Sequence, residues 1–262
     1  MGFPIGALFD ADATLEGVPP EVFGSLYSIM QARGLEEILH PMQDLIVMLG
    51  YGGYGFGVLW NDGDTLGVDA PLHGGVLSAV LPTYLADGVA HSDPLIKALL
   101  SAREPLLWAD FYAAGGGDPA GRETARRMFA NVGVAAGASI PVDIAALGCR
   151  AALAVAAAPG MTHDAFAQRF ALNGWVLRLA AAALGLVCGD KLAASIAGNL
   201  SPSEIAVLRG LANGQRPREI AGDLGKSEHT IRNQIVSAQT RLGVRTKEQA
   251  VAKALRFGLI VP

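Results

Sequence analysis

The chain has few cysteines and few charged residues for its length. Two of its 262 residues are cysteine, Cys149 and Cys188, and they lie far apart with no Cys or His at metal-ligand spacing. A disulfide framework and a zinc site are therefore not expected, and a reducing compartment fits this cysteine usage. Charged residues make up 17% and hydrophobic residues 51% of the chain. This balance excludes a disordered chain and predicts a sizeable apolar core.

The sequence also lacks the usual signals for export and membrane insertion. Its first residues, MGFPIGALFDAD, contain no basic group and soon turn acidic, unlike a signal peptide. They also lack the hydroxyl residue of a myristoylation motif. The most apolar run, LAAAALGLVCG, is about half as long as a membrane span. We therefore expect a cytoplasmic protein that does not insert into a membrane.

Motifs of common enzyme classes are missing as well. His40, His73, His91 and His163 are scattered along the chain. The sequence has no Gly-x-Ser-x-Gly elbow, phosphate-binding loop or His-Glu-x-x-His pair. We therefore expect no enzymatic activity, no metal site and no cofactor.

The charge that is present is unevenly divided along the chain. The formal net charge is -4. Residues 200–262 contain ten Lys and Arg residues and five Asp and Glu residues. Residues 1–199 contain ten basic and nineteen acidic residues. A basic C-terminal segment thus follows an acidic body, which indicates a polyanion as the partner of the C-terminal segment.

Hydrophobic periodicity predicts helices and short strands in the first 187 residues. We expect helices in the ranges 20–50, 74–102, 122–133 and 162–186, and strands in the ranges 51–60, 105–111, 136–144 and 148–158, with NDGD (61–64) as the turn of a hairpin. The predicted fold is α+β: an N-terminal α-β-α sandwich around an antiparallel sheet. The predicted domains are a body at 1–187, a linker at 188–199 and an all-α four-helix domain at 200–262.

Capping residues mark the four helices of the C-terminal domain. Ser201 to Glu204 form a capping box with proline at the first helical position. Pro217 opens the second helix, Ser227 caps the third, and Thr246 to Gln249 form a second capping box. A short helix, a glycine turn and a longer helix are the parts of a helix-turn-helix DNA-binding motif.

The third of these helices has two faces. The face expected to be buried comprises Ile231, Ile235, Ala238 and Leu242, and the face expected to meet DNA comprises His229, Arg232, Asn233 and Val236. Arg232 can bind a guanine edge with two hydrogen bonds, Asn233 can do the same on adenine, and Val236 can touch a thymine methyl group. Residues placed to hold phosphates are Lys226, Thr230, Arg218, Arg241, Arg245 and Lys247.

The segment from Leu200 to Val251 resembles the LuxR-type helix-turn-helix along its whole length. The matching residues are Leu200-Ser-Pro-Ser-Glu204, Val207-Leu208, Gly214, Glu219-Ile220-Ala221, Leu224-Gly225, Ser227, Thr230-Ile231 and Arg241-Leu242-Gly243-Val244. The resemblance implies that Arg232, Asn233 and Val236 face the bases of double-stranded DNA.

The body, from about Leu35 to Leu186, resembles the autoinducer-binding domain of LuxR-type quorum-sensing regulators. The resemblance rests on Tyr84, on Asp93-Pro94 nine residues later, on Trp108, and on Gly137 with the Ser139 to Val142 segment. It implies a cavity between the sheet and one helical layer that holds an acyl-homoserine lactone. The aspartate would accept the ligand amide N–H, the tyrosine would donate to the acyl carbonyl, and the tryptophan would pack on the lactone ring.

Two positions of the body depart from the pattern of the autoinducer-binding domain. Val80 stands where the family usually has a tryptophan that donates to the lactone carbonyl, and Ala154 stands on the last core strand, where Ser or Thr is common. The lactone end thus loses donors, which favours a different or differently seated ligand. The candidate ligand-binding residues are Tyr84, Asp93, Trp108, Val80, Ala154 and Phe111.

The sequence predicts a cytoplasmic, ligand-responsive, DNA-binding regulator that acts as a homodimer, since one such module covers few base pairs. The long apolar helix at 162–186 is a candidate dimer seam, or else a core helix of one subunit. An alternative keeps the DNA module but makes the body a ligand-independent dimerisation or partner-protein module. A closed core without a cavity would favour that alternative.

Overall fold

The computed structural model describes residues 19–61, 66–144, 149–198, 200–242 and 244–260. Contacts divide them into two compact units, an N-terminal unit that reaches Cys188 and a C-terminal unit from Gly189 onward. The first 18 residues, and all of the expected NDGD turn except Asn61, lie outside the described residues.

The N-terminal unit is built on a five-stranded antiparallel sheet with strand order β2-β1-β5-β4-β3. The strands are β1 (Gly53–Asn61), β2 (Leu66–Gly75), β3 (Leu106–Leu107), β4 (Gly137–Ile144) and β5 (Cys149–Ala156). The sequence predicts both β4 and β5. These two strands pair with each other, and Ser139 of β4 lies directly opposite Ala154 of β5.

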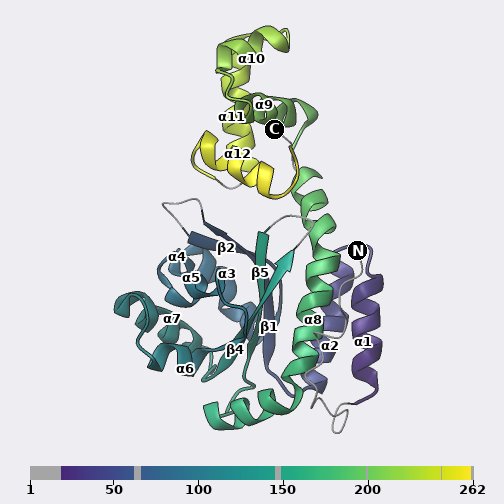
Figure 1. The fold of residues 1–262 in the computed structure, drawn as a ribbon, viewed down its shortest axis with the longest axis vertical. Helices are drawn as coiled ribbons and strands as arrows, with labels where there is room; N and C mark the ends of the chain where they lie inside the picture. Colours follow the sequence, from purple (N-terminus) through teal and green to yellow (C-terminus); the bar gives the residue numbers. More distant parts are fainter. Residues whose placement is uncertain (1–18, 62–65, 145–148, 199, 243, 261–262) are drawn as a thin grey trace. The chain divides into compact units, whose positions relative to one another are not determined.

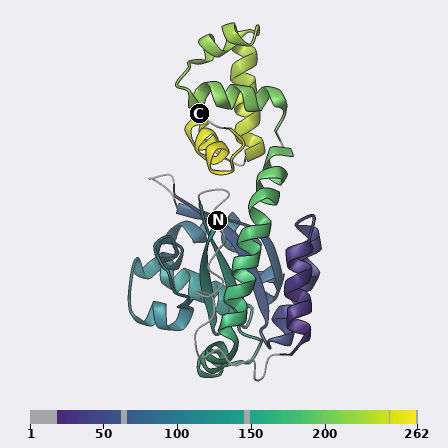
Figure 2. The same cartoon turned by 45° about the vertical axis from the view of Figure 1, so that its right-hand side comes forward.

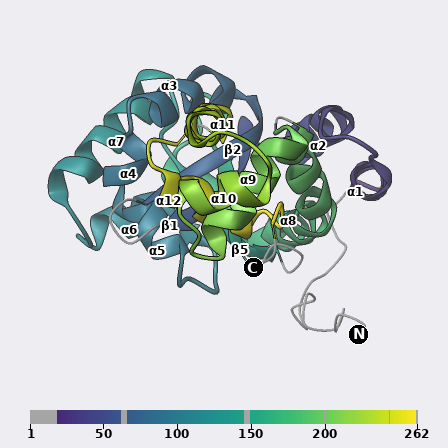
Figure 3. The same ribbon diagram turned by 90° about the horizontal axis from the view of Figure 1, so that it is seen from above.

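Helices cover both faces of the sheet (Figures 1 and 3). One face carries α1 (Glu21–Gln31), α2 (Glu36–Met48) and α8 (His163–Gly198). The other carries the short helix η2 (Val76–Ala79), α3 (Leu81–Ala86), α4 (Val89–Ser92), α5 (Pro94–Leu99), α6 (Trp108–Ala113) and α7 (Pro119–Asn131). The predicted α-β-α sandwich is confirmed.

Strand β1 shows how the two faces differ, because successive side chains point to opposite faces of a sheet. Tyr54 and Phe56 are fully buried, and the Tyr54 hydroxyl donates to the Leu39 carbonyl of α2 at 3.1 Å. The alternate positions, Gly55 and Gly57, have no side chain. Strand β1 therefore presents no side chain at these two positions of the face toward α3 to α7, which leaves room there for other side chains or a ligand.

Helix α8 is longer than the sequence predicts. It runs from His163 to Gly198, through the range 188–198 that was expected to be a linker (Figure 2). Within the described residues one segment, His163–Gly189, is long and apolar enough to span a membrane, and half of its most apolar window is buried in the protein. That burial is typical of a core helix.

Two further ranges differ from the prediction. The range 74–102 holds the end of β2 and four short helices rather than one main helix, because Gly75 and Gly88 adopt positive φ and Asp93 is extended. The range 105–111 contributes only two residues to a strand before α6 begins at Trp108. Strand β2 (Leu66–Gly75) pairs antiparallel with β1 and is the second arm of the predicted hairpin.

The C-terminal unit contains the four predicted helices: α9 (Pro202–Ala212), α10 (Pro217–Asp223), α11 (Glu228–Leu242) and α12 (Lys247–Arg256). Both predicted capping boxes are present, at Ser201 and at Thr246. The Ser227 hydroxyl accepts from the Thr230 amide at 3.1 Å, which caps α11 as expected. The apolar stripe of α11 is buried, so the all-α prediction is confirmed.

Candidate functional site

Asp93 is one of the few buried charged residues of the N-terminal unit, with 1% of its surface exposed. It stands at the N-cap of α5, where its Oδ1 accepts from the Leu95 amide at 2.9 Å. A cap of this kind explains why an aspartate precedes Pro94. A helix cap does not have to be buried, however, so capping alone does not explain why Asp93 is enclosed. A buried carboxylate needs hydrogen-bond donors in addition to the Leu95 amide.

Two tyrosine hydroxyls supply those donors. The Tyr84 hydroxyl donates to Asp93 Oδ2 at 2.7 Å, and the Tyr112 hydroxyl lies 2.9 Å from Oδ2 and 3.1 Å from Oδ1. Burial raises the pKa of the Asp93 carboxyl, and the hydrogen bonds from Leu95, Tyr84 and Tyr112 offset part of that rise. Burial and the nearby carboxylate raise the pKa of both tyrosines, so both remain donors at neutral pH.

Trp108 lies close to this cluster, at the start of α6. Its Nε1 donates to the Ser139 hydroxyl of β4 at 2.9 Å, and its ring centroid lies 4.9 Å from that of Phe129. A Cβ added to Gly137 would come within 2.5 Å of the Trp108 ring. Glycine at 137 therefore lets the indole lie flat against β4, which explains this part of the sequence motif.

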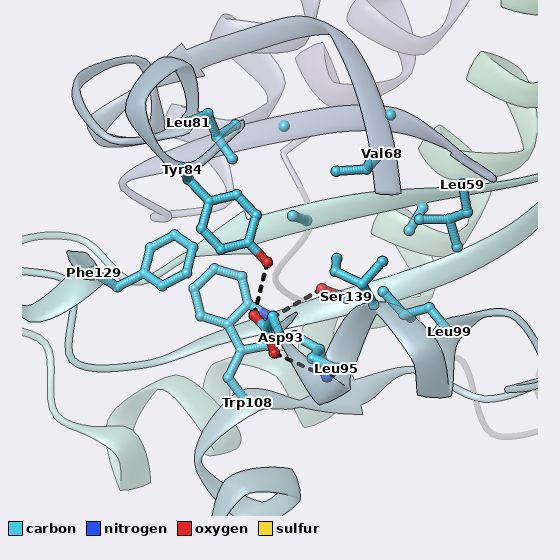
Figure 4. A pocket seen from close by; sticks show the side chains of 15 residues that line it. Leu59, Val68, Leu81, Tyr84, Asp93, Leu95, Leu99, Trp108, Phe129 and Ser139 are labelled. Carbon is cyan, nitrogen blue, oxygen red and sulfur yellow. Dashed lines mark hydrogen bonds between the residues drawn. The ribbon is translucent and has the colours of Figure 1, made fainter. Parts of the chain in front are cut away.

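These residues surround a small cavity between the sheet and the α3 to α7 layer (Figure 4). Its volume is about 60 Å³, room for a few waters, whereas ligand pockets usually measure roughly 300–1,000 Å³. The lining residues are Gly55, Gly57, Leu59, Val68, Leu81, Tyr84, Asp93, Leu95, Ile96, Leu99, Trp108, Phe129, Ser139, Ala152 and Ala154. In Figure 4, Leu59, Val68 and Leu99 lie together on one side of the polar groups.

The structure brings together four of the six candidate ligand-binding residues: Tyr84, Asp93, Trp108 and Ala154 all line the cavity. The other two, Val80 and Phe111, belong to the surrounding apolar core and do not line it. Sequence reasoning gave no role to Tyr112 or to the Ser139 hydroxyl. Tyr112 follows Trp108 by four residues, so helical spacing alone could have placed both on one face of α6.

The C-terminal unit presents the second candidate site, on α11. His229, Arg232, Asn233 and Val236 are all exposed on one face, as predicted. Val236 has 60% of its surface exposed although it is apolar, and such a side chain can pack on a thymine methyl group. This face is a candidate surface for the major groove of DNA.

The polar residues of this face are held by neighbours one helical turn away. Arg232 donates to Glu228 Oε1 through Nη2 at 2.6 Å, and Asn233 Nδ2 lies 3.2 Å from His229 Nε2. Among the expected phosphate-binding residues, Lys226 donates to the Ser203 hydroxyl of α9 at 2.9 Å. Arg218 on α10 is exposed.

Glu204 anchors α11 to α9. Its side chain is 4% exposed, one oxygen accepts from the Ser201 amide at 2.6 Å, and the other lies 3.4 Å from Arg241 Nε on α11. Burial alone would raise the pKa of Glu204, but hydrogen bonds from Ser237 and Ser201 and the charge of Arg241 together lower it. The ionised form therefore stabilises the arrangement of α9 and α11.

We expect Glu204→Gln to lower the stability of the C-terminal unit by about 1–2 kcal/mol at pH 7. Because the folded-state pKa lies below the unfolded value, the contribution is complete above the unfolded pKa of about 4.3 and is lost as the pH falls through the folded pKa. Urea unfolding from pH 7 to pH 3 measures it. Asp223→Asn, at an exposed aspartate of the same unit whose neighbour is the neutral Gln215 side chain, is the control, and an undiminished difference at pH 3 would contradict the assignment.

Two family models match the chain. The autoinducer binding domain matches residues 36–183, more than half of the chain, and the model for bacterial regulatory proteins of the luxR family matches residues 198–254. The first match contains the cavity and the second contains α9 to α11.

Individual relatives agree with these matches. The chain is 39% identical over 85 residues to VjbR of Brucella ovis, a quorum sensing-dependent regulator, and the match covers 32% of this chain and 33% of VjbR. The chain thus spans about a third of the length of VjbR. It is 27% identical over 179 residues to the transcriptional activator VanR of Vibrio anguillarum, which covers 68% of this chain and 72% of VanR.

The solved structure of CepR2 from Burkholderia cenocepacia, an N-acylhomoserine lactone dependent LuxR family transcription factor, has a similar fold. Its TM-score is 0.50 at 16% identity, and the match covers 65% of this chain and 95% of CepR2. The cavity, the exposed face of α11 and the two family matches lead to one conclusion: the chain belongs to the luxR family of bacterial regulatory proteins and contains their autoinducer binding domain.

Proposed function

We propose that the protein is a transcriptional regulator that binds a small signal beside Asp93 and double-stranded DNA through α11. The observation that carries the proposal is a buried carboxylate on a cavity in the same chain as a helix-turn-helix unit. A buried carboxylate is costly unless donors satisfy it, and a ligand with an amide or hydroxyl group can be such a donor.

The DNA part of the proposal is supported by the exposed face of α11. Arg232 and Asn233 have the side chains that recognise guanine and adenine edges, and both are exposed. The C-terminal residues carry an excess of basic groups, which suits the phosphate backbone.

The cavity lining supports a signal with one hydrogen-bond donor and an apolar body. Asp93 can accept from the donor, and the Ser139 hydroxyl, which accepts from Trp108, can donate its own proton to a ligand carbonyl. The apolar wall of Leu59, Val68 and Leu99 can take an acyl chain. CepR2 is lactone dependent by name, so an acyl-homoserine lactone or an atypical analogue is the proposed signal class.

We also propose that the protein is a cytoplasmic homodimer that needs no cofactor. Apolar side chains are exposed on α8, where Leu172 is 77% and Leu186 is 59% exposed. Exposed apolar residues on a helix can form a subunit contact. A dimer would also present two copies of α11 to a two-fold-related DNA site.

A second candidate function is favoured by the small cavity. The Asp93 carboxylate already has three donors from the protein, and about 60 Å³ is too little for a signal of lactone size. These observations fit a regulator whose N-terminal unit folds and dimerises without a ligand. The two candidates differ in whether any small molecule stabilises the N-terminal unit.

Thermal unfolding of the full chain with two matched compounds tests the proposal. N-octanoyl-homoserine lactone carries a lactone carbonyl, whereas N-cyclopentyl octanamide (the amide probe) keeps the amide donor and the ring but lacks that carbonyl. Because Val80 and Ala154 offer no side-chain donor, we expect the amide probe to bind about tenfold more tightly and to raise the melting temperature more. A larger shift with the lactone would contradict the proposed preference, and no shift with either compound would favour the ligand-independent candidate.

A further inference from the structure

Of the three donors to Asp93 in the described part of the chain, Tyr84 and Leu95 line the cavity and Tyr112 does not. Tyr84 is 3% exposed and packs against Phe129 with 5.6 Å between ring centroids. Tyr112 is only half-buried. Its hydroxyl is held at Asp93, but because part of the residue is exposed, a movement of the side chain can bring the hydroxyl into solvent, where water replaces the lost partner. The enclosed Tyr84 has no such route.

The carboxylate of Asp93 is saturated in the absence of any ligand. Oδ1 accepts from Leu95 and Tyr112, and Oδ2 accepts from Tyr84 and Tyr112. A ligand donor that approaches from the cavity must therefore displace one of these bonds. The Leu95 amide is fixed by the start of α5, and Tyr84 is enclosed, so Tyr112 is the partner that can leave.

We propose that Tyr112 is an internal competitor of the signal: it holds Asp93 in the ligand-free protein, and a signal binds by replacing the Tyr112 hydroxyl with a donor of its own. This inference rests on the proposed function. It also explains how the N-terminal unit keeps a buried carboxylate without a ligand, and it restricts the signal to molecules that present a hydrogen-bond donor. A ligand without one would leave the buried carboxylate short of a partner.

The space that a signal needs lies next to the same residues. A Cβ at Gly55 would come within 2.5 Å of Leu81 Cδ1. The Leu81 side chain therefore packs on β1 at the position where Gly55 has no side chain. Neighbouring positions of the sheet have no side chain or only a methyl group, because Gly57, Ala152 and Ala154 also line the cavity. Movement of the Leu81 side chain away from β1, together with release of Tyr112 from Asp93, would enlarge the cavity without any change in the sheet.

Tyr112→Phe tests the proposal, because it removes the competing hydroxyl and keeps the ring. We expect the dissociation constant of the amide probe to fall about tenfold, which corresponds to about 1.4 kcal/mol, and the melting temperature of the ligand-free protein to fall. An N-methylated form of the probe, which has no N–H, should gain nothing from the substitution. Isothermal titration calorimetry of the full chain measures all of these affinities.

Tyr54→Phe is the matched control, since it removes a buried tyrosine hydroxyl on the opposite face of β1 and should not change probe affinity. Equal or weaker binding to Tyr112→Phe, while Asp93→Asn still weakens binding, would overturn the role of Tyr112 and leave the signal site intact. An equal gain for the N-methylated probe would overturn it too. If neither wild type nor Tyr112→Phe binds the probe, the proposed signal site itself fails.

Discussion

Reversing two arginine charges, with Arg218→Glu and Arg232→Glu in one variant, is expected to weaken binding of a DNA duplex at low salt by about 100-fold or more. Arg232 lies on the exposed face of α11, and Arg218 is exposed on α10. We expect Arg232 to contact a base edge and Arg218 to contact a phosphate. Loss of both also makes the affinity less dependent on salt, because fewer counterions are released on binding.

Fluorescence anisotropy of a labelled duplex at several salt concentrations measures this effect. The matched control reverses Arg126 and Arg127, two exposed arginines of α7 in the N-terminal unit, and changes the net charge by the same amount. The control should keep the wild-type affinity within a fewfold. If the variant at Arg218 and Arg232 binds the duplex as well as this control does, α11 is not the DNA-reading helix.

Replacement of Asp93 by asparagine is expected to weaken binding of the amide probe by about 10- to 100-fold, or about 1.4–2.8 kcal/mol. The substitution removes the negative charge that the ligand N–H would meet. It keeps a side-chain oxygen that can accept from the Leu95 amide, so the cap of α5 and the fold should survive. The shift in melting temperature caused by the probe should shrink accordingly.

Asp110→Asn makes the same chemical change at an exposed aspartate that pairs with His163, outside the cavity. Its response to the probe should equal that of the wild type. An undiminished thermal shift in Asp93→Asn would show that the probe does not use this carboxylate.

Local signals were sufficient to predict the C-terminal unit. Its helices begin at caps that the sequence displays, such as Ser201 with Glu204, and the stripe of Ile231 and Ile235 repeats at helical spacing. These features depend on neighbours within one or two turns. For the same reason the sequence alone predicts the exposed face of α11.

Local signals did not reveal the full extent of two other elements. Strand β2 contains Asp69 and Pro71, which disfavour strands, yet it forms at the edge of the sheet through pairing with β1. Helix α8 passes through Gly189, because a single glycine weakens a helix without ending it.

The candidate site shows the same limit. The spacing of Tyr84, Asp93 and Trp108 predicted a common site, and all three line the cavity. Tyr112 is 19 residues from Asp93 in the chain, and only the packing of α6 against α5 brings the two together. The size of the cavity likewise depends on how Leu81 packs on the sheet, which no sequence pattern reveals.

Native mass spectrometry of the full chain with the amide probe tests most directly whether the cavity beside Asp93 holds a signal. We expect one probe molecule per chain on the wild type, and a strongly reduced fraction of that complex on Asp93→Asn at the same probe concentration. A wild-type chain that keeps its unliganded mass, or equal occupancy of the two proteins, would contradict the account.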